Sequence, residues 1–141
     1  MEKEEIKNIL PHRDPMLLVD RVILTEDGKA KGQYTVRGDE FFLQGHFPDN
    51  PVVPGVILCE MMAQTCCVLF SGKLANSTPF FTGLNNVKFK SKVVPGDTID
   101  FECEISKSLG NFFFASGKGT VNNVLAVSGD FSFALIKNNP V

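Results

Sequence analysis

The stretch PGVILCEMMAQTCCVLFSG, from Pro54 to Gly72, decides the fold. Pro54 and Gly55 are typical of the start of a helix, and Gly72 is typical of its end. Between them the residues are apolar on nearly every face, which indicates a helix buried in the middle of a domain rather than one lying on a surface. The apolar run is only 15 residues long, Val56 to Phe70, and it is interrupted by polar residues, so it is not expected to cross a membrane.

The segments on either side of this helix predict an antiparallel sheet. Before it, a short helix is expected at Lys3–Leu10, and a turn signal at Glu26–Gly28 separates two strand-like segments, Met16–Leu24 and Lys29–Val36. After it, turn dipeptides separate four strand candidates: Phe80–Val93, Thr98–Ser108, Phe112–Val121 and Val124–Lys137. We therefore expect a single α+β domain, residues 1–141, in which a curved antiparallel sheet wraps a long central helix. Such a sheet keeps an open edge, which dimerisation would close.

Composition narrows the class of protein. The chain has 141 residues, of which 43% are hydrophobic, so a folded domain with a sizeable core is expected. Its net charge of −2 offers no overall field for nucleic acid. The charged N-terminal segment MEKEEIKNIL lacks the apolar region of a signal peptide, which favours a cytoplasmic protein.

The cysteines and histidines do not predict a metal site. Four cysteines are present, none in a C-x-x-C pair, and the only two histidines, His12 and His46, lie far apart in the sequence. We expect no metal, no disulfide scaffold and no cofactor held by these residues. Buried reduced thiols are the simpler expectation.

Acid–base residues gather around the start of the central helix. The long Gly- and Pro-rich connection Arg37–Pro54 carries His46, whose ring is a natural base. The first N–H groups of the helix lack intrahelical partners and can polarise a carbonyl. Glu60 lies about one and a half turns further along, where an apolar wall should raise its pKa and make it an acid near neutral pH.

A base, an acid and a polarised carbonyl are the groups that a β-elimination next to a thioester needs. Plainer interpretations stay open for each residue taken alone. His46 could be a hydrogen-bonded loop residue. Glu60 could interact with the helix dipole or pair with a basic residue across an interface. Gln64, one turn after Glu60 on the same face, could orient it or satisfy a core contact.

Three segments and two single residues together are more specific than the acid–base residues taken one at a time. Along the chain they are LPHRDPMLLVDRV (10–22), HFPDNPVVPG (46–55), Glu60 fourteen residues after His46, Gln64, and FFTGLNNVKFKSKVVPGD (80–97). In this order, over nearly the whole chain, they resemble the FabZ family, the 3-hydroxyacyl-[acyl-carrier-protein] dehydratases of bacterial fatty-acid synthesis. Glu60 stands where the related dehydratase–isomerases have aspartate, which favours the non-isomerising branch.

The resemblance implies a hot-dog fold and homodimers, assembled as a trimer of dimers. It implies dehydration of (3R)-hydroxyacyl-acyl-carrier-protein without metal or cofactor, with His46 and Glu60 catalytic, each contributed by a different subunit. The Gly55 N–H would hold the thioester oxygen. The residues expected to line the substrate site are Phe47, Val53, Pro54, Gln64 and Phe80.

Four residues differ from the family pattern. Asp14 stands where many relatives have an aromatic residue or another polar one, Cys66-Cys67 replaces small residues, and Phe80 stands where some relatives have a tyrosine that gates the acyl tunnel. These differences leave the preferred acyl length and the gating open.

The acidic carrier protein requires a local basic patch on this slightly acidic chain. Lys88, Lys90 and Lys92 alternate and are expected to share one face of a strand, with Arg13 as a weaker candidate. An ordinary solvated strand face is the alternative. Two other functions stay open on the same fold, an acyl thioesterase and a non-catalytic acyl-thioester-binding protein.

Overall fold

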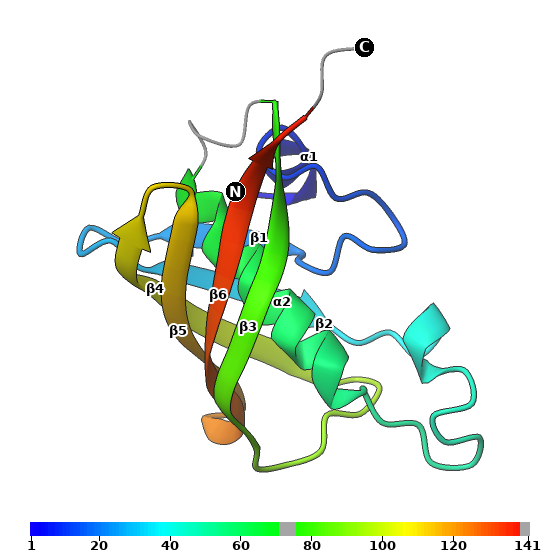
Figure 1. The fold of residues 1–141 in the computed structure, drawn as a ribbon. Helices are drawn as coiled ribbons and strands as arrows, with labels where there is room; N and C mark the ends of the chain where they lie inside the picture. Colours follow the sequence, from blue (N-terminus) through cyan, green and yellow to red (C-terminus); the bar gives the residue numbers. More distant parts are fainter. Residues whose placement is uncertain (71–75, 139–141) are drawn as a thin grey trace.

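A six-stranded antiparallel sheet curves around one long helix in the computed structural model, which describes residues 1–70 and 76–138 (Figure 1). The strand order is β1-β2-β4-β5-β6-β3. The fold class expected from the sequence is confirmed. The elements are α1 (Lys3–Lys7), β1 (Arg21–Leu24), β2 (Ala30–Thr35), the 3₁₀ turn η1 (Phe41–Leu43), α2 (Gly55–Cys67), the 3₁₀ turn η2 (Val68–Phe70), β3 (Ser77–Phe89), β4 (Thr98–Leu109), β5 (Phe112–Val121) and β6 (Val124–Lys137).

Helix α2 begins where Pro54 fixes the backbone. Pro54 is the N-cap, and its carbonyl accepts hydrogen bonds from the N–H groups of Ile57 and Leu58, at 3.0 and 3.3 Å. Nearly every α2 side chain from Leu58 onward is buried, as the all-round apolar pattern predicted. The regular helix ends at Cys67 and continues into η2; the expected end at Gly72 lies outside the described residues.

Strand β2 lies directly against α2 because Gly32 has no side chain. A Cβ atom at Gly32 would collide with the side chain of Thr65. The Thr65 hydroxyl donates instead to the carbonyl of Met61, one turn back, at 2.9 Å. In another part of the core, the rings of Phe70, Phe113 and Phe133 pack against one another.

The expected strand at Met16–Leu24 was partly wrong, because only β1, Arg21–Leu24, forms there. Leu17, Leu18 and Val19 are all buried in succession, which the alternation of a half-exposed strand does not allow. The N–H of Leu18 donates to a helix side chain, Gln64 Oε1, rather than to a neighbouring strand. The short helix also ends at Lys7, earlier than expected.

Strand β3 forms one edge of the sheet, and within residues 1–70 and 76–138 it pairs with β6 alone. Several large apolar side chains along it are exposed: Phe80, Phe81, Leu84 and Phe89. An edge with free backbone groups and exposed apolar side chains is a surface suited to pairing with another chain.

The connection from β2 to α2 projects away from the sheet and helix (Figure 1). Its first turn is anchored by Glu40, which is only 5% exposed. The Glu40 carboxylate accepts hydrogen bonds from the N–H groups of Arg37 and Gly38 and from the Tyr34 hydroxyl, at 2.8 to 2.9 Å. Burial acts to raise the pKa of Glu40, but these hydrogen bonds outweigh it and hold the pKa below 4.5.

All four cysteines are free and buried, as predicted. Burial raises the pKa of each thiol, to about 12 for Cys67 and Cys103. The Cys103 thiol contacts the Met62 carbonyl on α2 at 3.4 Å. The cysteines therefore behave as small core residues.

Candidate active site

Glu60 is a partly exposed carboxylate on helix α2, whose other residues from Leu58 to Cys67 are buried. Its side chain is 23% exposed. Burial raises the pKa of Glu60, while a hydrogen bond from Gln64 acts in the opposite direction and is the weaker effect. The expectation that an apolar wall raises this pKa is confirmed. A raised pKa keeps a larger fraction of this carboxyl group protonated at a given pH than an ordinary glutamate has, so Glu60 is suited to donate a proton.

Gln64 fixes Glu60 to the N-terminal segment of the chain. Its side-chain nitrogen donates to Glu60 Oε2 at 2.9 Å and to the Met16 carbonyl at 2.8 Å. Its oxygen accepts from the N–H of Leu18 at 2.8 Å. The amide is fully buried and its groups are paired, so both alternatives considered for Gln64, orientation of Glu60 and a core contact, describe it.

His12 lies beside the same carboxylate, and no pattern in the sequence predicted this contact with Glu60. Its Nε2 atom is 3.6 Å from Glu60 Oε2. The residue belongs to the LPHR segment, which contributed to the family resemblance but carried no role of its own. No helical or strand period connects two residues 48 positions apart, so only the fold brings them together.

A small cavity of about 30 Å³ opens at these polar groups. His12, Glu60 and Gln64 form its polar side. The remaining lining is apolar and comes from α2 and two neighbouring strands: Ala63, Cys67, Pro79, Phe80, Phe81 and Phe133. The Phe80 ring is 54% exposed, so it lies where the cavity meets the surface. A cavity of this size holds about one water molecule, so it marks the acid end of a site that an acyl chain would have to widen.

His46 lies on the projecting loop and is not among the residues that line this cavity. Its Nδ1 atom is 3.0 Å from the carbonyl of Val52. Because a carbonyl only accepts, this contact places a proton on Nδ1 and leaves the lone pair on Nε2 available as a base. The ring stacks on Phe47, with centroids 4.5 Å apart, and Phe47 is itself 56% exposed.

Gly55 begins α2 and lies at a second groove of about 590 Å³. A Cβ atom at Gly55 would come within 2.7 Å of the Phe89 ring, so glycine allows a close contact with the end of β3. Val53 also lines the groove but is buried, and its N–H donates to the Val93 carbonyl at 2.9 Å. Pro54 is the helix cap described above.

The lysines expected on one strand do not all lie on it. Strand β3 ends at Phe89, so Lys90 and Lys92 lie beyond it, and this part of the prediction was wrong. Lys90 and Lys92 line the groove beside Gly55, and none of the described residues lining that groove is acidic. Arg13 turns its guanidinium back to the carbonyls of Leu10 and His12, at 2.9 and 2.7 Å.

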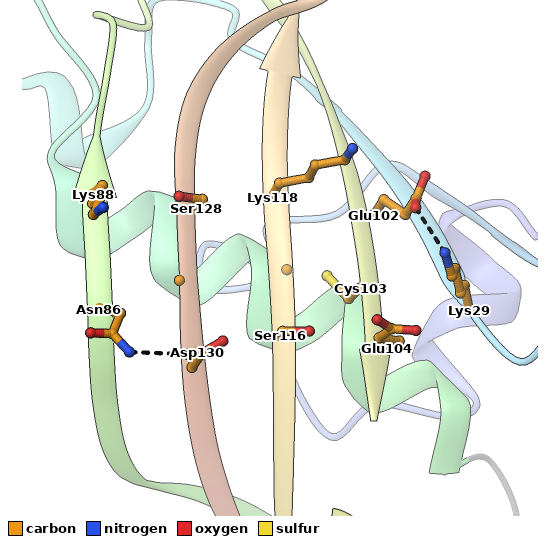
Figure 2. A pocket seen from close by; sticks show the side chains of 12 residues that line it. Lys29, Asn86, Lys88, Glu102, Cys103, Glu104, Ser116, Lys118, Ser128 and Asp130 are labelled. Atoms are coloured by element: carbon orange, nitrogen blue, oxygen red, sulfur yellow. Dashed lines mark hydrogen bonds and ion pairs between the residues drawn. The ribbon is translucent and has the colours of Figure 1, made fainter. Parts of the chain in front are cut away.

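Lys88 lies elsewhere, on the face of the sheet away from α2 (Figure 2). The groove on this face holds about 500 Å³. Its lining carries lysines and carboxylates in equal number: Lys29, Lys88, Lys118, Glu102, Glu104 and Asp130. Lys29 pairs with Glu102 at 3.4 Å, and Asn86 donates to Asp130 at 3.3 Å. The charges of this groove therefore balance locally.

Within residues 1–70 and 76–138, no three His, Cys, Asp or Glu side chains are arranged to hold a metal ion. No helix in these two ranges has the length and apolar character needed to span a bilayer.

Known proteins resemble the chain in fold and sequence. Residues 10–130 match the family model of the FabA-like domain. Two chains of solved structures share the fold: a dehydratase heterocomplex, ApeI:P, from Xenorhabdus doucetiae (TM-score 0.79, 23% identity, 95% of this chain and 91% of that one) and a hypothetical thioesterase with coenzyme A from Streptococcus pneumoniae (TM-score 0.62, 11% identity, 85% and 88%). The chain is thus a FabA-like domain with the hot-dog fold.

Sequence identity defines the family more closely. The 3-hydroxyacyl-[acyl-carrier-protein] dehydratase FabZ of Clostridium perfringens (strain SM101) is 44% identical over 137 residues, which cover 96% of this chain and 99% of that protein. The FabZ of Natranaerobius thermophilus is 45% identical over 140 residues, covering 94% and 96%. This chain belongs to the FabZ family.

Proposed function

We propose that this chain is a cytoplasmic dehydratase that converts (3R)-hydroxyacyl-acyl-carrier-protein to trans-2-enoyl-acyl-carrier-protein in fatty-acid biosynthesis. The observation that carries this proposal is Glu60, a carboxyl group with a raised pKa that lines a small, mostly apolar cavity. The FabZ relatives, at 44 to 45% identity over nearly the whole chain, support the same reaction.

Each group has one task in the proposed reaction. His46 Nε2 removes a proton from the carbon next to the thioester carbonyl. The Gly55 N–H, at the positive end of α2, stabilises the negative charge that develops on the thioester oxygen. Glu60 gives its proton to the β-hydroxyl, the C–O bond breaks, and water leaves. Afterwards His46 carries the extra proton and Glu60 is ionised, and exchange with solvent restores both.

The substrate would occupy the space between these groups. Gln64 holds Glu60, and Phe80 at the cavity mouth contacts and gates the acyl chain. Phe47 supports the His46 ring, while Val53 and Pro54 shape the wall beside Gly55. No cofactor takes part in this scheme.

In this proposal the site is complete only in a homodimer. The His46 loop projects from the domain, and His46 is not among the residues lining the cavity beside Glu60 of its own chain. We assign His46 and Glu60 of one site to different subunits, which pair along the free edge of β3. Three such dimers then assemble into a hexamer.

Replacing Leu84 by glutamate tests the β3 interface. Leu84 is an exposed apolar residue on this edge strand, and two like charges at a two-fold interface repel each other. We expect the Leu84→Glu variant to sediment as smaller species at a concentration where the wild type is oligomeric. The control is Ile23→Glu, at an exposed apolar position on β1 at the opposite edge of the sheet. Unchanged sedimentation of Leu84→Glu would remove β3 from the interface.

The reaction itself is tested with the carrier-linked substrate. We expect purified protein and a 3-hydroxyacyl thioester of acyl carrier protein to give the ultraviolet absorbance of a conjugated enoyl thioester, without release of free thiol. Free thiol without enoyl product would assign a thioesterase instead. Acyl binding with neither product would assign a binding protein.

The acidic carrier protein would dock on the basic groove beside Gly55 and, more weakly, on Lys88 and Arg13. Reversing the charges of Lys88 and Lys90 is expected to raise KM for the carrier-linked substrate at low salt. Of the two single variants, Lys90→Glu should raise KM more than Lys88→Glu, because the charges around Lys88 already balance. KM for a small thioester substrate should not change in either variant. The control is Lys107→Glu on β4; an equal rise in KM there would mean a general charge effect rather than docking.

A further inference from the structure

His12 faces Glu60 from outside helix α2. The backbone around it is held on both sides. Arg13 donates to the carbonyls of Leu10 and His12, and Gln64 ties the segment from Met16 to Leu18 onto the helix. The imidazole is 20% exposed and lines the same cavity as Glu60. Its position over the carboxylate is therefore set by the fold and not by side-chain freedom.

The two ring nitrogens of His12 have different surroundings. Nε2 faces Glu60 Oε2 at 3.6 Å. Nδ1 is buried, and among residues 1–70 and 76–138 no protein group hydrogen bonds it. A buried N–H without a partner is rarer in proteins than an acceptor without one. The favoured neutral tautomer therefore keeps the bare lone pair at Nδ1 and the proton on Nε2, directed at Glu60.

The charge state agrees with this tautomer. Burial lowers the pKa of His12, and the nearby charge of Arg13 lowers it further, so the ring is neutral at neutral pH. The other groups that face Glu60 are Gln64 and, on its own helix, the thiols of Cys59 and Cys67. The charge of Glu60 helps to raise the pKa of both thiols. Among residues 1–70 and 76–138, His12 and Gln64 are therefore the side chains whose N–H groups can donate to this carboxylate.

We infer that His12 is a positioning residue that acts through Glu60, with its Nε2–H as a second donor beside Gln64 Nε2. The inference rests on the proposed role of Glu60 as the acid. The 3.6 Å separation exceeds an ordinary hydrogen bond and shortens when substrate fills the cavity, since catalytic contacts are commonly longer in the free enzyme. Two donors from separate segments hold the acid at a fixed angle to the leaving hydroxyl.

A pair of His12 variants separates this role from simple packing. His12→Gln keeps an N–H donor near the position of Nε2, whereas His12→Leu keeps apolar volume and loses the donor. We expect the leucine variant to lose about ten- to hundredfold in kcat, the range for a misplaced catalytic group, with little change in KM. The glutamine variant should recover most of the loss. If leucine performs as well as glutamine, or if both lose activity only through unfolding measured by thermal denaturation, the inference is wrong.

The pH profile gives a second readout. A donor stabilises the carboxylate and lowers the pKa of Glu60, so its loss raises that pKa. Protonated Glu60 is the active form, and the alkaline limb of kcat/KM should therefore move to higher pH in His12→Leu but not in His12→Gln. An unmoved limb in the leucine variant contradicts the inference.

A double-mutant cycle with Glu60→Gln tests whether His12 acts through Glu60. If it does, adding His12→Leu to Glu60→Gln costs almost nothing further. Additive losses would mean that His12 contacts substrate by itself, and would overturn the inference.

One measurement does not depend on turnover. The ¹⁵N shifts of the His12 ring should show the Nε2–H tautomer at neutral pH, and the ¹³C titration of Glu60 should move upward in His12→Leu. These signals can be read even if the chain forms no enoyl product, so failure of the proposed function and failure of this inference are distinguishable. An Nδ1–H tautomer or a charged ring at neutral pH would overturn it.

Discussion

Replacing His46 by alanine or Glu60 by glutamine is expected to reduce enoyl formation by about two orders of magnitude or more, since positioned acid and base groups contribute that much. The loss should appear in kcat. His46→Ala removes the lone pair that accepts the α-proton, and Glu60→Gln keeps the shape of the side chain but removes the proton that the leaving hydroxyl needs. The measurement is steady-state turnover of the carrier-linked hydroxyacyl thioester, followed by ultraviolet absorbance.

One control variant and one mixing experiment accompany these variants. Asp49→Asn changes an exposed acidic residue on the same loop and should leave kcat unchanged. Mixing the two inactive variants should restore part of the activity if each site takes His46 from one subunit and Glu60 from the other. The mixed dimer then contains one site with both wild-type residues. Retention of near-normal kcat in either single variant would remove that residue from the chemistry.

Replacing Glu40 by alanine is expected to cost about 3 kcal/mol of unfolding free energy, because it leaves two backbone N–H groups and the buried Tyr34 hydroxyl without their acceptor. For a domain of this size the midpoint of thermal unfolding should fall by roughly 10 °C. The same change should loosen the loop that carries His46 and lower kcat in the fraction that remains folded. Chemical denaturation and turnover on one preparation measure both effects.

The neighbouring carboxylate provides the control. Asp39 is exposed and pairs with Arg37 only at the surface, so Asp39→Ala should change the unfolding free energy by less than about 1 kcal/mol.

The stability that Glu40 contributes should also depend on pH. Its pKa is lower in the folded chain, so its contribution is complete above the ordinary value of 4.5 and is lost as pH falls through the folded value. The gap between wild type and Glu40→Ala should therefore narrow in acid, and a gap that widens would contradict this account.

The sequence predicted those parts of the molecule whose pattern is local. Strands β4, β5 and β6 are separated by clear turn signals, so their bounds were predicted to within one residue. The raised pKa of Glu60 followed from one carboxylate inside an apolar helix. The segment from Met16 to Val19 was predicted as strand because a short buried run gives the same signal whether its N–H groups meet a strand or a side chain.

His12 shows what sequence pattern could not supply. Its approach to Glu60 depends on two hydrogen bonds of Gln64, to the carbonyl of Met16 and from the N–H of Leu18, between segments that no period relates. Lys90 and Lys92 were placed on a strand by alternation alone, while β3 ends before them. Such contacts and strand ends are set by tertiary packing.

The buried thiols have a practical consequence for labelling. With a pKa of about 12, the thiols of Cys67 and Cys103 are ionised at neutral pH to about one part in 10⁵, and the thiolate is the form that reacts with maleimides. The native thiols should therefore react only very slowly with maleimides. A cysteine introduced at an exposed site away from the β3 edge, such as Ile23→Cys on β1, would react alone and accept a fluorophore or spin label without removal of the native cysteines. Distances between two subunits could then be measured in a molecule that differs from the natural one at a single position.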